Sequence, residues 1–530
     1  MTLGESSPES AIRREHPVIN RPSDPDGVLG MPTVGTTLVS DGMTPFMDDE
    51  SPSPSAIWRL DEFNTDPGYR AYQEELRCLL FTTAQTAATT REGTPAPPLV
   101  PPEPGLPDSG NSSNIGRTSS DPSKVRETAD ILAKGRRMEY LQNYVAVVAP
   151  WLDMFDGCRT FGLQVPVLAR TSPALLYAVL ALSARQMERR EEEGNLNLQR
   201  RRKRRGRGSF DSLELYQEAI RRLTPLLQVR DPNIVAICTV LCVMEMMSAS
   251  AQDWRKHLQG CAALFDVLGV HGFSGGLSQA VFWCYARMDL CGALISDGMQ
   301  STLVPPAKWL APGVDVANAR ELFRQTASPD MHANYAVYLC AKACDLTAAR
   351  TRFTELGEAN GCDSYAFASR WLALWEDLQD WVRDRPTELL PVETIEGTPF
   401  PHILYVHWAA ISSNQLYHTA CILLLDMVPR PLNQKIVGSV GSPAWHVKRI
   451  CGISLTNPHQ GCLNNAIQPL WIAGRLLTHE SEHALIVKLI WEIEAKTGWG
   501  TRWRIPDLET AWGYRVCKDG WTTGRETGKM

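Results

Sequence analysis

The amino-acid sequence predicts an all-α protein, a large, irregular and solenoid-like helical bundle that follows a long disordered N-terminal arm. Three observations predict this fold class. Apolar residues recur at helical spacing through most of the chain after residue 137. Signals for helix starts and stops separate these segments at short intervals. Alternating strand patterns are nearly absent, and 17 of the 36 prolines lie within residues 1–136.

Residues 1–136 are expected to form a mostly disordered, acidic, Pro/Ser-rich arm, because they cannot bury enough apolar surface to offset the entropy of ordering. Within the arm, four apolar side chains lie among acidic ones: Phe46, Trp58, Leu60 and Phe63. This composition is typical of a disordered activation segment, whose carboxylates keep apolar side chains available to a coactivator groove. The alternatives are an accidental apolar patch or a piece that docks onto the helical domain. A helix over residues 69–85 is also expected to dock on the core.

Residues 137–530 are expected to form one helical domain with a basic loop at 194–208. Ser172 and Pro173 look like the N-cap and first turn of a helix, and Gly498 looks like a stop. Asp231–Pro232 and Asp211 with Glu214 are further start signals. Helices are predicted over residues 137–149, 173–193, 211–228, 232–249, 253–268, 277–296, 332–356, 365–384, 402–427, 443–452, 463–477 and 482–497. Their short connections predict antiparallel neighbours.

Composition excludes several classes of protein. The formal net charge of −6 gives no global attraction to nucleic acid, so any DNA contact would be local. All 14 cysteines except Cys78 lie at or after Cys158, mostly in apolar helical patterns, which predicts buried reduced thiols. The first residues lack a signal-peptide pattern. The uncharged stretch 403–425 is interrupted by polar residues and is predicted to be a core helix, so no membrane partner is expected.

A basic run is the strongest local signal in the chain. Seven cations occupy eight positions between two predicted helices: Arg200, Arg201, Arg202, Lys203, Arg204, Arg205 and Arg207. Such self-repelling charge is expected to be exposed. It fits a nuclear-import signal, in which an extended basic segment meets an acidic receptor groove. The alternatives are a nonspecific phosphate contact and a solvated loop neutralised by nearby glutamates.

The segment His479-Glu480-Ser481-Glu482-His483 matches H-E-x-x-H. In that arrangement two histidines one helical turn apart bind zinc and the glutamate activates water. Polar residues at the two intervening positions, and a Thr478 that looks like an N-cap, favour a capped helix start instead. Glu492, Glu494 and Glu509 are available as a third ligand, but no pattern supports any of them.

Two other patterns have structural explanations. Residues 272–276 match G-x-S-x-G, the nucleophile elbow of hydrolases, but a helix enters this turn where that chemistry requires a strand. A glycine-rich turn between helices is therefore predicted. Trp371, Trp375 and Trp381 lie at helical spacing in the later half of the chain, which predicts core packing. An aromatic-lined effector pocket is the alternative.

Five segments together carry a resemblance to a known family: residues 138–192, 209–227, 253–277, 282–298 and 497–514. In this order they resemble the fungal-specific transcription factor domain, the helical region that usually follows a six-cysteine zinc binuclear cluster. That cluster needs cysteines spaced about C-x2-C-x6-C, twice. Only Cys78 precedes Met138, so this chain lacks the cluster. The basic run is an insertion relative to the family pattern, so the resemblance implies no role for it.

The resemblance implies a nuclear regulator of RNA polymerase II genes that acts by association, with no catalytic residue, cofactor or metal site in this chain. Zinc is expected only if a cysteine cluster is encoded upstream. DNA would then be bound by that module; otherwise promoter DNA would be reached through a partner. The expected partners are coactivator or corepressor proteins and a second regulator, in a homodimer or heterodimer. The alternatives are a zinc-dependent hydrolase using His479, Glu480 and His483, and a cytosolic helical scaffold.

Overall fold

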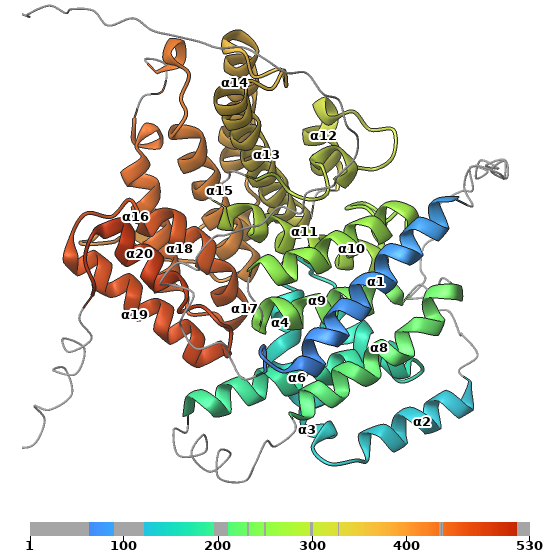
Figure 1. Cartoon of the computed structure of the whole chain (residues 1–530). Coiled ribbons are helices and arrows are strands. Elements are labelled where there is room, and N and C mark those ends of the chain that lie inside the picture. Colours follow the sequence, from blue (N-terminus) through green and yellow to red (C-terminus); the bar gives the residue numbers. More distant parts are fainter. Residues whose placement is uncertain are drawn as a thin grey trace, which may run out of the picture. The chain divides into compact units, whose positions relative to one another are not determined.

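The computed structural model describes residues 63–89, 121–194, 210–229, 233–248, 251–296, 300–326, 328–433, 436 and 438–516. The chain divides into two compact units, Met1–Ser51 and Pro52–Met530, and all described residues belong to the second. This second unit is built almost entirely of helices, which confirms the predicted all-α class (Figure 1).

The first half of this unit packs around α6 (Pro173–Gly194), which was predicted as a helix over residues 173–193. α6 lies against α8 (Asp211–Val229) and α9 (Ile234–Ser248), and α9 contacts α10 (Ala251–Leu268) and α11 (Gly276–Ile295). Shorter pieces precede α6: α2 (Pro122–Leu132), α3 (Arg137–Asn143), the π-helix Tyr144–Val148, α4 (Ala149–Leu152), the π-helix Thr160–Gln164 and α5 (Val165–Ala169). The predicted helix 137–149 is therefore divided at Tyr144.

The second half packs around α13 (Pro329–Leu356) and α15 (Trp408–Leu425). The remaining helices are α12 (Ala319–Gln325), α14 (Ser364–Arg383), α16 (Pro443–Thr456), α17 (Gln460–Leu463), α18 (Ile467–Gly474), α19 (Glu480–Thr497) and α20 (Arg504–Trp512). Short 3-10 turns lie at Pro306–Trp309, Val316–Asn318, Thr387–Leu389, Arg430–Leu432, Ser439–Gly441 and Asn464–Ala466. One of these divides α17 from α18, where a single helix over 463–477 was predicted.

A small hairpin corrects the predicted helix 402–427. β1 (Glu393–Ile395) pairs antiparallel with β2 (His402–Leu404), in the register Thr394 opposite Ile403. The helix begins only at Trp408, because the His407 side chain accepts a hydrogen bond from Ala409 N and caps it. The prediction of a core helix in this region is confirmed, since every residue from Ala409 to Leu424 is buried. No helix in the described part of the chain is long and apolar enough to cross a membrane.

The helix signals are only partly correct at the level of single residues. Ser172 accepts a hydrogen bond from Leu175 N at the start of α6, as predicted. Gly498 ends α19 in the left-handed region (φ 74°), also as predicted. α19 is capped by His479 and not by Thr478, and Asp211 lies in the first turn of α8. The start signal Asp231–Pro232 lies outside the described residues.

Two helices lie ahead of the predicted domain start at residue 137. α1 (Pro67–Thr89) is the helix expected at 69–85, and it packs against α10 and α8 (Figure 1). α2 packs against α6 and α3. Both helices therefore belong to the helical unit. α1 buries Tyr69, Leu76 and Leu80 against it.

Candidate functional site

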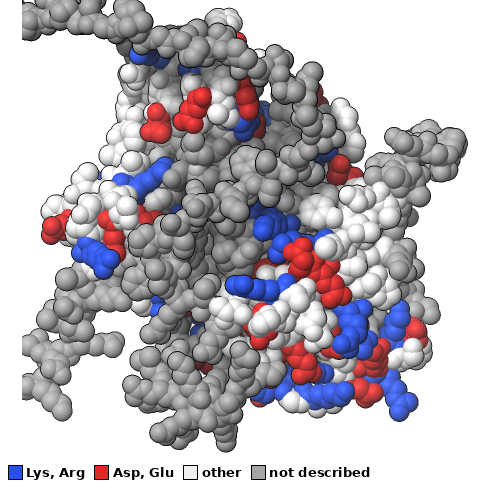
Figure 2. Space-filling view, in the orientation of Figure 1, with Lys and Arg blue, Asp and Glu red and all other residues white. Residues whose placement is uncertain are grey.

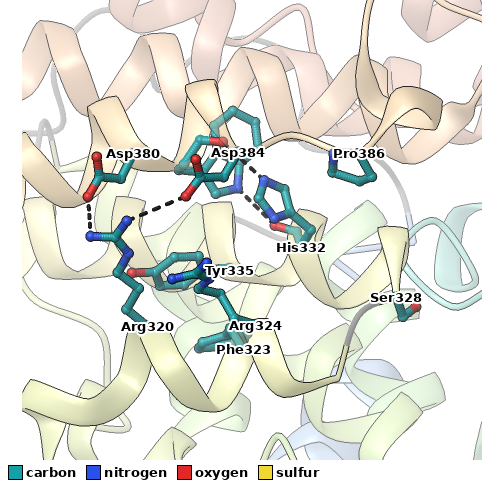
Figure 3. A pocket seen from close by; sticks show the side chains of 10 residues that line it. Arg320, Phe323, Arg324, Ser328, His332, Tyr335, Asp380, Asp384 and Pro386 are labelled. Carbon is teal, nitrogen blue, oxygen red and sulfur yellow. Dashed lines mark hydrogen bonds and ion pairs between the residues drawn. The ribbon is translucent and has the colours of Figure 1, made fainter.

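A pocket of about 240 Å³ lies where α12, α13 and α14 meet. We call it the α12–α14 pocket (Figure 3). Ten residues line it: Arg320, Phe323, Arg324, Ser328, His332, Tyr335, Asp380, Trp381, Asp384 and Pro386. Three come from α12, two from α13 and two from α14; Ser328 and Asp384 are the N-cap of α13 and the C-cap of α14.

Ion pairs join α12 to the end of α14 along one side of the pocket. The Arg320 guanidinium binds Asp380 and lies 3.4 Å from Asp384 (Figure 3). Arg383 also binds both carboxylates, at 2.5 Å from Asp380 and 3.1 Å from Asp384. Each aspartate is therefore shared by the same two arginines. Arg324 lines the pocket without an ion-pair partner among the residues that the structure describes.

Two stacked aromatic pairs supply the apolar walls. The rings of Phe323 and Tyr335 lie 4.6 Å apart at 23°. Those of His332 and Trp381 lie 5.2 Å apart, also at 23°. Trp381 Nε1 donates to the carbonyl of His332 (2.9 Å), and His332 Nε2 lies 3.1 Å from the carbonyl of Trp381. These reciprocal bonds lock α13 to α14 at the pocket.

Burial sets the protonation of the two titratable aromatic side chains. Desolvation lowers the pKa of His332 below its ordinary value, so the imidazole is neutral and donates from Nε2 to the carbonyl of Trp381. Desolvation raises the pKa of Tyr335, so its hydroxyl stays protonated and is available as a donor. The pocket thus offers a neutral donor and a guanidinium between aromatic walls, which is a binding chemistry without an evident nucleophile.

The sequence identified only one member of this pocket. Trp381 was predicted to be a core residue, and it is buried, as are Trp371 and Trp375. α12 was not predicted at all, because seven residues give too short a periodic pattern. The sequence does contain two charged i,i+4 pairs, the basic Arg320/Arg324 and the acidic Asp380/Asp384. These pairs have complementary charges, but the sequence does not show that the two helices meet.

The H-E-x-x-H residues form a helix start, as the structural alternative predicted. His479 caps α19 by accepting from Ser481 N. His483 is buried against Trp512, with ring centroids 3.9 Å apart at 9°, and its Nδ1 lies 2.6 Å from the Tyr514 hydroxyl. One histidine is thus a cap and the other a core side chain. Nowhere among the described residues do three His, Cys, Asp or Glu side chains gather to hold a metal ion.

The G-x-S-x-G residues form the predicted turn between two helices. α10 enters this turn and α11 leaves it. The Ser274 hydroxyl accepts a hydrogen bond from His271 N at 2.9 Å. Gly275 and Gly276 have φ values of 75° and 52°, which L side chains rarely adopt, so glycine is required for the turn. Ser274 is therefore a turn residue, and no strand raises its hydroxyl.

The activation-segment prediction needs a correction at Phe63. Its ring is completely buried, 4.4 Å from Tyr69 and 5.5 Å from Phe210, with the Arg185 guanidinium 4.2 Å from its centroid. A side chain held in this way is not available to a coactivator. Phe63 instead docks onto the helical domain, which was the alternative given for this segment. Phe46, Trp58 and Leu60 lie outside the described residues, as does the whole basic run 200–207.

The cysteines do not fit a six-cysteine zinc cluster. Those that the structure describes are free thiols, and most are buried within helices; Cys78 and Cys158 are exposed. No cysteines in the sequence have the paired C-x2-C-x6-C spacing that two zinc ions require. The cysteines of this sequence therefore do not supply the ligand pattern of that cluster.

Comparison with known proteins identifies the class of the helical unit. Residues 139–508 match the family model described as "Fungal specific transcription factor domain". The chain is also similar to "Transcription activator AMTR1" of Alternaria alternata, at 21% identity over 345 residues. That match covers 53% of this chain and 44% of the relative, so it spans less than half of the relative's length. No solved structure matches the chain.

Proposed function

This chain belongs to the fungal specific transcription factor domain family, and from that premise we propose that it regulates RNA polymerase II genes in the nucleus by binding partner proteins. The single observation that supports this best is the family match, which runs from α3 to α20 and thus through nearly all of the helical unit. The family match establishes the class of the helical unit. The regulatory activity, the genes, the location and the route to DNA are proposed.

DNA is reached either through a zinc cluster outside this sequence or through a partner that carries one. Charge supports this indirect route, because basic and acidic side chains are interspersed on the face that carries α1, α2 and α8 (Figure 2). Arg77 pairs with Glu74, Arg222 with Glu127 and Glu218, and Arg137 with Glu214. Neutralised surface of this kind does not attract a phosphate backbone.

Two segments complete the proposed regulator. The basic run from Arg200 to Arg207 serves as the nuclear-import signal, supported by its seven cations in eight positions. The acidic segment with Phe46, Trp58 and Leu60 contacts a coactivator or corepressor, supported by apolar side chains set among carboxylates. The helical unit pairs with a second regulator, as a homodimer or heterodimer.

Chromatin occupancy tests the regulatory function. The native locus is tagged at its C-terminus, and occupancy is mapped under several growth conditions. Discrete promoter peaks are expected, and the size of the tagged product then shows whether further sequence precedes this chain. A nuclear product without enrichment at any promoter contradicts the proposal and favours a scaffold.

Import is tested separately, with a variant in which all seven cations of the basic run are replaced by Gln. We expect the tagged protein to shift from the nucleus to the cytoplasm, because the receptor groove recognises their charge. The matched control replaces Arg70, Arg126 and Arg221, exposed arginines on α1, α2 and α8, and should remain nuclear. A fully nuclear seven-Gln variant removes the import role from this segment.

A further inference from the structure

We propose that the α12–α14 pocket binds a small aromatic carboxylate. The proposal adds a ligand to the helical unit and does not depend on how the protein reaches DNA. It is based on three features of the pocket: a surplus positive charge, a buried hydroxyl donor without a partner, and facing aromatic surfaces.

The first feature is the charge balance. Asp380 and Asp384 each bind both Arg320 and Arg383, so these four groups neutralise one another. Arg324 adds a guanidinium to the lining and has no ion-pair partner among the described residues. The pocket therefore carries one excess positive charge, and a guanidinium binds a carboxylate through two parallel hydrogen bonds.

The start of α13 increases this preference for an anion. Ser328, the N-cap of this 28-residue helix, lines the pocket, and its side chain makes no capping bond. The unpaired backbone N–H groups at a helix start favour negative charge. Asp330, the acidic residue of the first turn, does not line the pocket, and Gly157 donates a backbone hydrogen bond to it.

The second feature is the hydroxyl of Tyr335. This residue is only 4% exposed, and its hydroxyl has no hydrogen-bond partner among the described residues. A buried hydroxyl donor that is left unpaired is energetically unfavourable. An anion in the pocket would accept this hydrogen bond. A ligand without an acceptor would leave the hydroxyl unpaired, so the pocket favours ligands that carry one. In Figure 3 the hydroxyl lies beside the Arg320 side chain.

The third feature is the pair of aromatic walls, which selects a flat apolar group. Phe323 stacked on Tyr335 and His332 stacked on Trp381 present ring surfaces to the same small volume. About 240 Å³ is below the range of about 300–1,000 Å³ that drug-sized ligands occupy. The occupant is therefore a compact acid with one ring, such as a benzoate or a phenylacetate.

Calorimetric titration of the full chain tests the proposal with defined probes. Benzoate and phenylacetate are expected to bind. Benzamide, which keeps the ring without the charge, and acetate, which keeps the charge without the ring, are expected to bind at least about tenfold more weakly. Equal binding of benzamide overturns the anionic assignment, and equal binding of acetate overturns the aromatic one. Failure of both aromatic acids to bind overturns the site.

Two variants assign the binding to this pocket. Arg324→Gln should weaken benzoate binding by about tenfold or more, and Tyr335→Phe by about threefold to tenfold. The controls are Arg126→Gln on α2 and Tyr365→Phe, whose side chain is 86% exposed on α14. Arg324 is exposed, so its variant should fold, and circular dichroism checks this. Unchanged affinity in both pocket variants contradicts the proposal, whereas the chromatin experiment is unaffected by either result.

Discussion

Two histidines, His418 on α15 and His446 on α16, are buried against each other with their Nδ1 atoms 2.8 Å apart. His446 Nε2 donates to the carbonyl of Val440 (2.9 Å), so its Nδ1 accepts a hydrogen bond from the Nδ1–H of His418. Burial lowers the pKa of His446 to about 4. Burial, then His446 and the nearby Arg449 and Arg385, lower the pKa of His418 as well. Both imidazoles are therefore neutral in the folded protein.

The histidine pair predicts that the protein loses stability in mild acid. The folded pKa of His446, about 4, lies below the ordinary value of 6.5, so the unfolded chain binds more protons between these values. Its contribution is complete above pH 6.5 and is lost as the pH falls toward 4. Each pH unit in this window costs about 1.4 kcal/mol for His446. Urea unfolding at several pH values measures the slope.

The control for this prediction separates the pair from other acid effects. His446→Gln should give a shallower dependence of the unfolding midpoint on pH between 6.5 and 4. His402→Gln, at an exposed position on β2, should keep the slope of the unaltered protein. An unchanged slope in the His446 variant would show that other groups cause the acid sensitivity.

Phe63 provides the second prediction at the residue scale. Its buried ring contacts Tyr69, Phe210 and the guanidinium of Arg185. Phe63→Ala should lower the free energy of unfolding by about 3–5 kcal/mol, because the change leaves a cavity and removes the cation–π contact. Phe81→Ala on α1, where the side chain is 38% exposed, should cost less than about 1 kcal/mol. Equal losses in the two variants would mean that Phe63 is not anchored in the core.

At the scale of elements, α1 depends on a close approach to α10. A Cβ atom at Gly260 on α10 would lie 3.0 Å from two side-chain atoms of Leu80 on α1. Glycine at this position therefore allows the two helices to pack. This contact makes α1 part of the helical unit, although it lies in the stretch predicted to be mostly disordered.

This approach predicts a compensating pair of substitutions. Gly260→Val should destabilise the protein by about 1–3 kcal/mol through overpacking, and Leu80→Ala by about 2–5 kcal/mol through a cavity. The double variant should be no less stable than Leu80→Ala alone, because the valine fills the space that leucine leaves. Urea unfolding of the four proteins measures the coupling. Simple addition of the two losses would contradict the contact.

Element predictions succeeded where a long periodic pattern met a clear stop signal. α6 and α19 lie close to their predicted bounds because Ser172 and Gly498 are local signals. The predicted helix 402–427 was too long at its start. There β2 pairs with β1, and Asn457, the C-cap of α16, donates from Nδ2 to the Ile403 carbonyl at 2.7 Å. Those contacts are not local in sequence, so periodicity could not detect them.

At the scale of the whole molecule, the order of the family-like segments was enough to predict the class of protein. α6, α8, α10 and α11 lie within the matched residues 139–508, and α20 begins within them. The candidate pocket could not be predicted in this way. Its lining comes from three helices, one of them the short α12, and its charge balance depends on Arg320 reaching across to Asp380 and Asp384.

The sequence by itself determined the helical class, the family and the position of most long helices, because each depends on local periodicity, end signals and segment order. Only the tertiary structure decided that Phe63 is a core residue, that His479 and His483 serve as a cap and a packed side chain, and that three arginines and two aspartates meet beside one pocket. These outcomes depend on distances between residues far apart in the chain. Packing sets those distances, and a linear pattern does not record them.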